Sequence, residues 1–214
     1  MRKRSTYKVK NLAPGSGFRL EFELDKVLLF TLALTRKHMF STAFKDHLWE
    51  KYRLEYELCL GRFPRVDSET ITKKVDLPGF FREGEKNPEF QKLLKDTKKY
   101  KKWVEKEWER KKDIVLPLVE EITKIKVPKE TFIVKIIAPI LKGGSNTGKY
   151  IIWGHEEAWE NYTVVYLMHE LFHHFLERGP VSHSVQELAI DNELRIRLNK
   201  KKNYAFDGEP SVGH

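Results

Sequence analysis

The stretch from residue 162 to residue 179 reads YTVVYLMHELFHHFLERG, and it contains His169, Glu170 and His173 in the order H-E-x-x-H. Apolar residues recur at helical spacing along the stretch, which predicts an amphipathic helix that ends at Gly179. Residues four apart lie one above the other on a helix, so the imidazole rings of His169 and His173 should lie side by side. The sequence therefore predicts a helix that presents two metal-binding groups on one face.

Histidine nitrogens are ligands that zinc prefers, and Glu170 lies about 100° further round the helix, over the open side of a metal held by both histidines. This arrangement is typical of metal-assisted hydrolysis of an amide, in which a metal acidifies water and a glutamate takes the proton. The alternative is a pair of core histidines that neighbouring carbonyl groups satisfy. We expect both histidines to point into the protein, because the other residues on their helix face are apolar or aromatic. These residues are Tyr162, Val165, Tyr166, Phe172 and Leu176.

A catalytic zinc site needs a third protein ligand and keeps its fourth position for water. Ser184 opens a second predicted helix, SVQELAIDNELRIRLNKK. Glu187 and Asp191 fall on its apolar side, and two buried carboxylates need partners. We expect Glu187 to be the third ligand and Asp191 to orient a ligating histidine through its other ring nitrogen. The apolar side of this helix is defined by Leu188, Ile190, Leu194 and Leu198.

Other roles remain open for these positions. Ser184 and Glu187 have the spacing of a capping box, which would explain Glu187 without a metal but would leave a buried aspartate unexplained. Glu193 is the main alternative for the third ligand, although it is also placed to pair with Arg197 as a solvated charge. His183, on the loop between the two helices, is a further option.

The run HELFHH (residues 169–174), followed by ELAID (residues 187–191), resembles the gluzincin group of zinc metallopeptidases over about residues 163–198. The resemblance implies a zinc-dependent hydrolase that acts on peptide bonds. In the best-known member of the group, the third ligand lies further from the H-E-x-x-H motif than Glu187 does here. That longer spacing would select Glu193 in this chain. The roles that the resemblance implies are zinc ligation by His169, His173 and Glu187, general-base catalysis by Glu170, and support of a histidine by Asp191.

Hydrolysis of an amide also needs a hydrogen-bond donor for the oxyanion of the tetrahedral intermediate. We prefer two candidates for this catalytic role, namely His183 on the connecting loop and Tyr166 on the ligand face of the motif helix. Tyr162 and Tyr204 are alternatives.

The chain has 214 residues, a net charge of +9 and one cysteine, Cys59. A single cysteine excludes an internal disulfide and favours a reducing, cytoplasmic location. The basic N-terminus is not followed by an apolar signal core, and the apolar run at 27–34 is too short to span a bilayer. We therefore expect a peptide or protein substrate and no membrane partner, while the sequence does not indicate an oligomeric state.

The positive charge raises the question of a nucleic-acid partner. The lysines of residues 92–112 are interspersed with glutamates, which is typical of an exposed helix with i,i+4 ion pairs. No zinc knuckle, aromatic RNA-binding signature, helix-turn-helix pattern or phosphate-binding glycine loop is present in the sequence. Nucleic acid is therefore not an expected main partner. The alternative to a peptidase is a non-catalytic, zinc-stabilised module that binds protein or nucleic acid.

The whole pattern predicts a mostly helical α+β protein. Residues 1–112 would form an N-terminal helical region, and residues 113–214 a zincin-like region with a small hairpin, either as two domains or as one compact unit. We nominate the strand at 150–154 as the edge that holds an extended peptide substrate. The further expected elements are a strand at 18–24, helices at 25–38, 41–60, 87–112 and 114–125, a loop at 62–87, and a strand at 131–139 that pairs with 150–154 as a hairpin.

Overall fold

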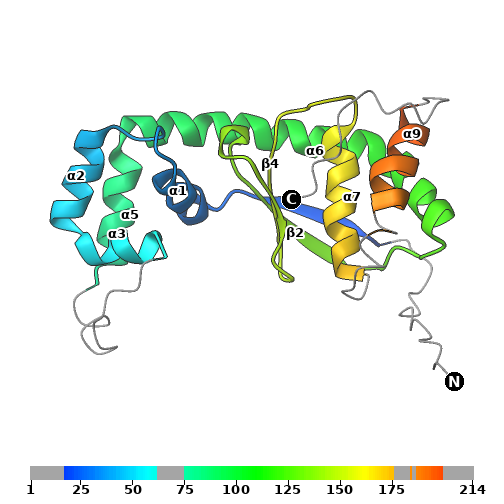
Figure 1. Ribbon diagram of the computed structural model, residues 1–214, viewed down its shortest axis with the longest axis horizontal. Helices are drawn as coiled ribbons and strands as arrows, with labels where there is room; N and C mark the ends of the chain where they lie inside the picture. The colour runs from blue at the N-terminus through cyan, green and yellow to red at the C-terminus, as the bar shows by residue number, and fades with distance from the viewer. Residues whose placement is uncertain (1–16, 62–74, 176–183, 185–186, 200–214) are drawn as a thin grey trace, which may run out of the picture.

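The computed structural model describes residues 17–61, 75–175, 184 and 187–199, which confirm a mostly helical α+β fold around a small sheet (Figure 1). A 3₁₀ turn, η1, and a π-helix, η2, accompany the α-helices and strands. In chain order the elements are β1 (Arg19–Glu23), α1 (Lys26–Thr35), α2 (Thr42–Lys51), α3 (Arg53–Cys59), α5 (Leu77–Lys86), α6 (Pro88–Thr123), β2 (Thr131–Ile136), η1 (Pro139–Leu141), β3 (Gly143–Asn146), β4 (Ile151–Gly154), α7 (Tyr162–Phe175), η2 (Glu187–Leu194) and α9 (Arg195–Leu198).

The sheet has the strand order β1-β2-β4-β3. β1 confirms the strand expected at 18–24, and it pairs in parallel with β2. The expected hairpin of β2 and β4 is wrong, because these strands are also parallel neighbours. The antiparallel partner of β4 is β3, which lies in the segment expected to be a loop. Glycine is a weak strand former, and at Gly143 the end of the Ile137 side chain occupies the space that a Cβ would take, 2.5 Å away.

α6 is a single helix of 36 residues, where the sequence predicted two helices that meet near residue 113. It begins as expected, with Pro88 in the first turn and the Asn87 side chain accepting a hydrogen bond from the Phe90 N–H (3.0 Å). Pro117 lies on the exposed side of the helix, and Val115 and Val119 on either side of it are fully buried. Packing of these valines therefore holds the helix across a residue that cannot donate a backbone hydrogen bond.

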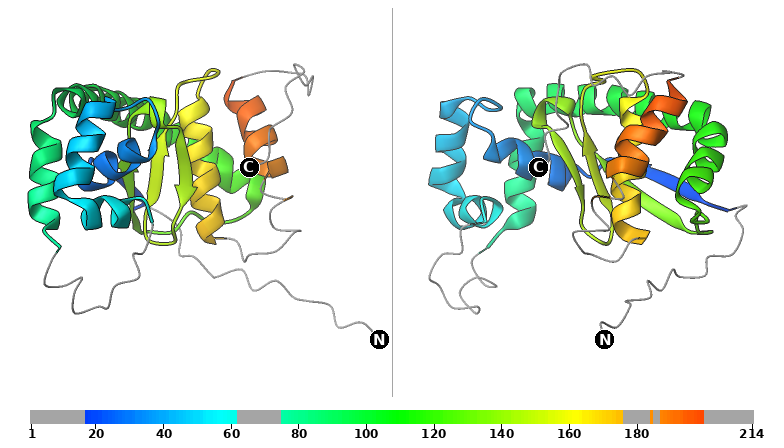
Figure 2. Two further views of the ribbon diagram at one scale, coloured as in Figure 1. Left: turned by 60° about the vertical axis from the view of Figure 1, so that its left-hand side comes forward. Right: turned by 45° about the vertical axis from the view of Figure 1, so that its right-hand side comes forward.

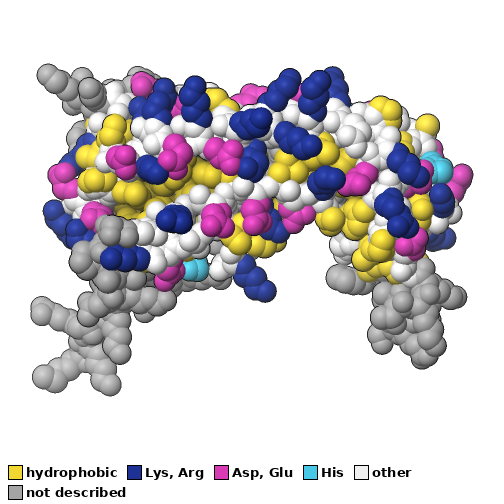
Figure 3. Space-filling model, turned by 180° about the vertical axis from the view of Figure 1, so that it is seen from behind, with side chains coloured by type: hydrophobic (Ala, Val, Ile, Leu, Met, Phe, Trp, Pro, Cys, Tyr) yellow, Lys and Arg dark blue, Asp and Glu magenta, His cyan; other side chains and the backbone are white. Residues whose placement is uncertain are grey.

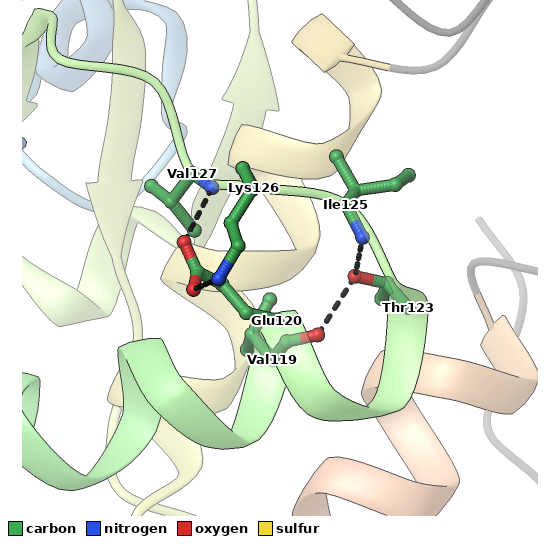
Figure 4. Close-up of polar contacts among 6 residues, drawn as sticks. All are labelled: Val119, Glu120, Thr123, Ile125, Lys126 and Val127. Carbon is green, nitrogen blue, oxygen red and sulfur yellow. Dashed lines mark hydrogen bonds and ion pairs between the residues drawn. The ribbon is translucent and has the colours of Figure 1, made fainter. Parts of the chain in front are cut away.

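The C-terminal end of α6 is fixed by side chains that cap its last turn (Figure 4). Lys124 takes a left-handed conformation (φ 57°), which ends the helix. The Glu120 carboxylate then accepts hydrogen bonds from Lys126 Nζ (2.7 Å) and the Val127 N–H (3.0 Å). Thr123 Oγ1 donates to the Val119 carbonyl and accepts from the Ile125 N–H. These bonds direct the chain back toward β2.

The N-terminal helices differ from the sequence pattern in three places. Asp25 caps α1 as expected, with its side chain accepting from the Leu28 N–H (3.0 Å), but α1 ends at Thr35. The helix expected at 41–60 is divided at Tyr52 into α2 and α3. The loop expected at 62–87 is wrong in its described part, since α5 occupies it. A Cβ on Gly84 would lie 2.5 Å from the Phe30 ring, so this glycine allows two helices to approach rather than ending one.

Two buried clusters stabilise the fold. The sheet core joins β2, β4, α7, η2 and the C-terminal half of α6. The helical core joins α1, α2, α5, the N-terminal part of α6 and the segment around η1. α6 runs from Pro88 to Thr123 and belongs to both clusters, so the domain boundary expected at residue 112 falls inside a continuous helix. β1, which precedes that boundary, pairs with β2, which follows it.

α7 lies against the sheet, and η2 and α9 lie beside α7 in both views of Figure 2. The second helix expected at the site is thus present, but its first part is wound as a π-helix. Ile190, Asp191, Leu194 and Leu198 are buried, whereas Leu188 is 65% exposed, so its placement on the apolar side was wrong. The wider π winding shifts each side chain relative to an α-helix, and such turns are frequent at functional sites.

Within the part of the chain that the structure describes, no helix combines the length and apolar character needed to cross a membrane. α6 is long enough, but charged residues cover it from end to end.

Candidate metal centre

α7 carries the H-E-x-x-H motif and is held by its apolar residues. Leu167, Met168 and Leu171 are fully buried in the sheet core. At the start of the helix, the Thr163 N–H donates to the Glu157 carboxylate (3.1 Å), which satisfies one of the first backbone donors. The helix is therefore anchored at its beginning and along its buried face.

The two motif histidines face one another across one turn of α7. Their Nε2 atoms are 3.0 Å apart, and the ring centroids are 4.7 Å apart. A tetrahedral zinc ion with Zn–N bonds of about 2.0–2.1 Å holds two nitrogens about 3.3 Å apart. The histidine pair is therefore close to the spacing of two zinc ligands. His173 is exposed, so the expectation that both histidines point into the protein was wrong for this residue.

Asp191 on η2 contacts the other ring nitrogen of His169. His169 Nδ1 lies 2.8 Å from Asp191 Oδ1, and both side chains are nearly buried. An ionised carboxylate only accepts hydrogen bonds, so Nδ1 carries the proton and Nε2 presents its lone pair to a metal. Burial lowers the pKa of His169, but the hydrogen bond and charge of Asp191 outweigh burial, and the net pKa is raised.

Glu170 is 9% exposed and lies beside this pair on α7. Burial raises the pKa of its carboxyl group; the charge of His169 opposes this effect and that of Asp191 adds to it. The Glu170 backbone carbonyl accepts a hydrogen bond from Asn146 Nδ2 (2.7 Å) at the end of β3. Asn146 Oδ1 also accepts from the Gly148 N–H (2.7 Å), so this residue joins the β3–β4 turn to the motif helix.

Of the three candidates for the third ligand, His183 lies outside the described residues, and the two glutamates lie in different surroundings. Glu187 is half-buried on η2, and its charge makes a minor contribution to raising the pKa of both His169 and Tyr166, smaller than the effects of burial and of Asp191. Glu193 Oε1 instead accepts from Arg197 Nε (2.5 Å), as the sequence indicated for a solvated charge. Among the described residues, no three His, Cys, Asp or Glu side chains form a metal-binding group, so the third ligand stays a prediction.

Tyr166 lies one turn before His169, with ring centroids 5.7 Å apart. It packs on Tyr162 (4.5 Å) and stacks on Trp153 (6.4 Å). Burial, followed by the charge of Asp191, raises the pKa of Tyr166 to about 12. The phenol therefore keeps its proton near neutral pH and remains a donor. The other catalytic candidate, His183, lies outside the described residues, as do Leu176 and Tyr204.

The edge of the sheet next to the motif helix is β3. The nomination of residues 150–154 as an edge strand was wrong, because β4 pairs with β2 on one side and with β3 on the other. Among the strands that the structure describes, β3 pairs only with β4, and it contacts α7. The sequence pattern missed both this strand and its last residue, Asn146. The run N-T-G at 146–148 was a signal for an Asx turn, but not for a contact with α7.

Comparison of the chain with protein-family models, with curated proteins and with solved structures found no match.

Proposed function

We propose that this protein is a zinc-dependent metallopeptidase whose metal is held by His169 and His173. The observation that carries the proposal is the pair of Nε2 atoms 3.0 Å apart, one of them on a ring whose Nδ1 bonds a buried aspartate. Carboxylate–histidine pairs of this kind orient ligands in zinc sites. Asp191, 9% exposed, has its hydrogen-bond partner in this ring, and the bond leaves Nε2 of His169 turned toward His173.

Glu187 is the proposed third ligand. Its charge acts on His169, and its position on η2 places it four residues before Asp191. Glu193 is the alternative, but its bond to Arg197 would have to break first. When bound at these residues, zinc would supply the Lewis acidity that makes a water molecule acidic near neutral pH and polarises a carbonyl group.

Glu170 is the proposed general base. A buried carboxylate with a raised pKa is a better proton acceptor than a solvated one, and its pKa lies closer to the working pH. Glu170 would take a proton from water and pass it to the leaving amine. Asn146, which bonds the Glu170 carbonyl, would hold this part of α7 against β3.

β3 is the proposed substrate strand. An extended peptide can add to an unpaired sheet edge through backbone hydrogen bonds, which would hold the scissile bond beside α7. Tyr166 is the proposed donor to the oxyanion, and its pKa, raised to about 12, keeps the phenol a donor into the alkaline range.

The test of the catalytic proposal is Glu170→Gln, compared with wild type on a library of quenched-fluorescent peptides. The change preserves size but removes the base, so we expect cleavage to fall at least about 100-fold while zinc content is retained. Glu160→Gln, at an exposed position before α7, is the matched control. Full activity in Glu170→Gln would exclude Glu170 as the base. Zinc in wild type without cleavage of any library peptide would favour the non-catalytic, zinc-stabilised module.

A further inference from the structure

One face of α6 carries only positive charge. Taking 100° per residue, we find that six residues fall within an arc of about 80°, and that between residues 92 and 110 no other residue falls in this arc. All six are exposed lysines or arginines. We call them the basic stripe: Lys92, Lys95, Lys99, Lys102, Lys106 and Arg110.

Ion pairs within the helix do not explain the basic stripe. The expected i,i+4 pairing is seen for Lys101 with Glu105 (2.5 Å), but Lys101 lies outside the stripe. Within the stripe, Arg110 pairs with Glu107, and Lys99 lies 3.9 Å from Asp96. Among the described residues, the other four stripe lysines form no ion pair with any acidic side chain. Each stripe residue instead has a like charge three or four positions away, an arrangement that destabilises an isolated helix.

The basic stripe also accounts for much of the charge of the protein. Residues 92–112 contain ten basic and four acidic side chains, an excess of six, while the whole chain has a net charge of +9. The opposite face of the same helix is buried in the two cores through Leu93, Leu94, Val104 and Trp108. Seen from behind, Lys and Arg side chains gather along the upper part of the molecule, where α6 runs (Figure 3).

The shape of this surface favours one class of partner. From Lys92 to Arg110 the helix rises about 27 Å. A nucleic-acid duplex of about eight base pairs has the same length, and both of its strands carry phosphates along it. Insertion into a membrane needs an exposed apolar helix face, but α6 buries that face in the protein. Single-stranded nucleic acid is usually bound by exposed aromatic rings, whereas Trp103 is partly buried and stacked on Tyr100 (5.6 Å).

We propose that the basic stripe of α6 binds the phosphate backbone of a nucleic-acid duplex, without reading its sequence. The stripe offers amines and a guanidinium at regular intervals, and such contacts position a protein on a duplex but carry no base specificity. This inference does not depend on the metal centre, which is built from α7 and η2.

The test uses a 20-base-pair DNA duplex and fluorescence anisotropy at several salt concentrations. Each neutralised phosphate contributes about 0.9 to the slope of log K against log salt, so six contacts predict a slope of about −5. Lys95→Gln/Lys102→Gln/Lys106→Gln should reduce the magnitude of that slope by about 2.7. The corresponding triple Arg variant keeps the charges and should retain the wild-type slope.

The matched control is Lys37→Gln/Lys129→Gln/Lys149→Gln, which removes the same charge from exposed lysines in turns outside α6 and should keep the wild-type slope. Equal slopes for the two Gln variants would overturn the proposal, as would the absence of duplex binding by wild type at low salt. Tighter binding to phosphatidylserine vesicles, or to an acidic peptide, than to the duplex at the same salt would also overturn it.

Discussion

The helical core and the sheet core bury very different side chains. Phe30 is at the centre of the helical core and contacts the rings of Phe40, Phe80, Phe81 and Phe90 at centroid distances of 5.2–5.9 Å. The helical part also buries two polar side chains, but each bonds the backbone: Glu55 accepts from the Asp76 N–H (2.5 Å) and Thr97 donates to the Leu93 carbonyl (2.8 Å). The sheet core adjoins four buried polar residues on and beside α7 and η2. These are Asn161, Thr163, Glu170 and Asp191.

Burial of a carboxylate is costly unless it is paired, and it is rarely chosen for stability alone. Asp191 has His169 as its partner, and Glu170 is held beside the same histidine. The two regions therefore differ in what their buried carboxylates face: Glu55 bonds a backbone N–H, whereas Asp191 and Glu170 lie beside a histidine. Substitutions in the two regions should have separable effects.

The largest expected effect is on the stability of the helical core. Phe30→Ala removes a fully buried ring with several edge-to-face neighbours, so it should lower the free energy of unfolding by about 3–5 kcal/mol. Urea unfolding measures this change, with Val27→Ala on the exposed side of the same helix as the control. The zinc affinity of the folded variant should equal that of wild type. A loss of zinc binding without a loss of stability would contradict the division between the regions.

A second prediction concerns the support of the metal ligand. Asp191→Asn removes the charge that orients His169, so zinc affinity should fall about 10- to 100-fold, as for other outer partners of zinc ligands. Competition with a chromophoric chelator measures the affinity, and Asp113→Asn on the exposed side of α6 is the control. Unchanged affinity in Asp191→Asn would show that Asp191 does not support a ligand.

A smaller effect is expected where β3 meets α7. Asn146→Ala removes the bond to the Glu170 carbonyl, which should cost about 1 kcal/mol of stability and lower kcat more than it raises KM. Peptide cleavage and urea unfolding measure the two effects. Ser145→Ala, at the preceding exposed position, is the control and should change neither quantity. If kcat is equal in the two variants, Asn146 does not position Glu170.

The smallest effect depends on pH and concerns Asp25, which caps α1 of the helical core and bonds Lys135 on β2 of the sheet. Burial raises the pKa of Asp25, but hydrogen bonds from Lys135 (2.6 Å) and the Leu28 N–H outweigh burial, and the net pKa is lowered. A lowered folded-state pKa stabilises the protein above the unfolded value of 3.8, and this stabilisation is lost as pH falls through the folded-state value.

Asp25→Asn keeps a capping side chain but loses the charge, so it should be less stable than wild type by about 1 kcal/mol at pH 7. The difference should stay constant down to about pH 5 and shrink below about pH 4. Urea unfolding across this range measures it. A difference that does not change with pH would show that the charge of Asp25 contributes nothing.

Local signals predicted several features correctly. Asp25 and Asn87 each occupy a capping position that depends on neighbouring residues alone, and both caps are present. The burial of Asp191 could be predicted because this aspartate falls among the apolar positions of its helix. Its pairing with a histidine followed, because a buried carboxylate needs a partner that donates a hydrogen bond.

Features that depend on distant contacts were not predictable in this way. The sequence pattern predicted Gly84 to lie in a loop, but it lies in α5. The Phe30 ring occupies the space that a side chain at this position would fill. The parallel pairing of β2 with β4 depends on the position of β3, whose glycines give no strand signal. Leu188 is exposed, and even at the α-helical 100° per residue it lies about 120° from the centre of the face that Ile190, Leu194 and Leu198 define. No residue pattern in ELAIDNEL distinguished the π winding of η2 from an α-helix.

The measurement that tests the central claim most directly is the zinc content of the purified protein by elemental analysis. Wild type should contain about one zinc per chain, and His169→Ala and Glu187→Ala should contain almost none. Glu193→Ala, in which the bond to Arg197 is lost, should keep the wild-type content. If wild type contains no zinc after zinc has been supplied, the histidine pair is not a metal site and the proposed peptidase is wrong.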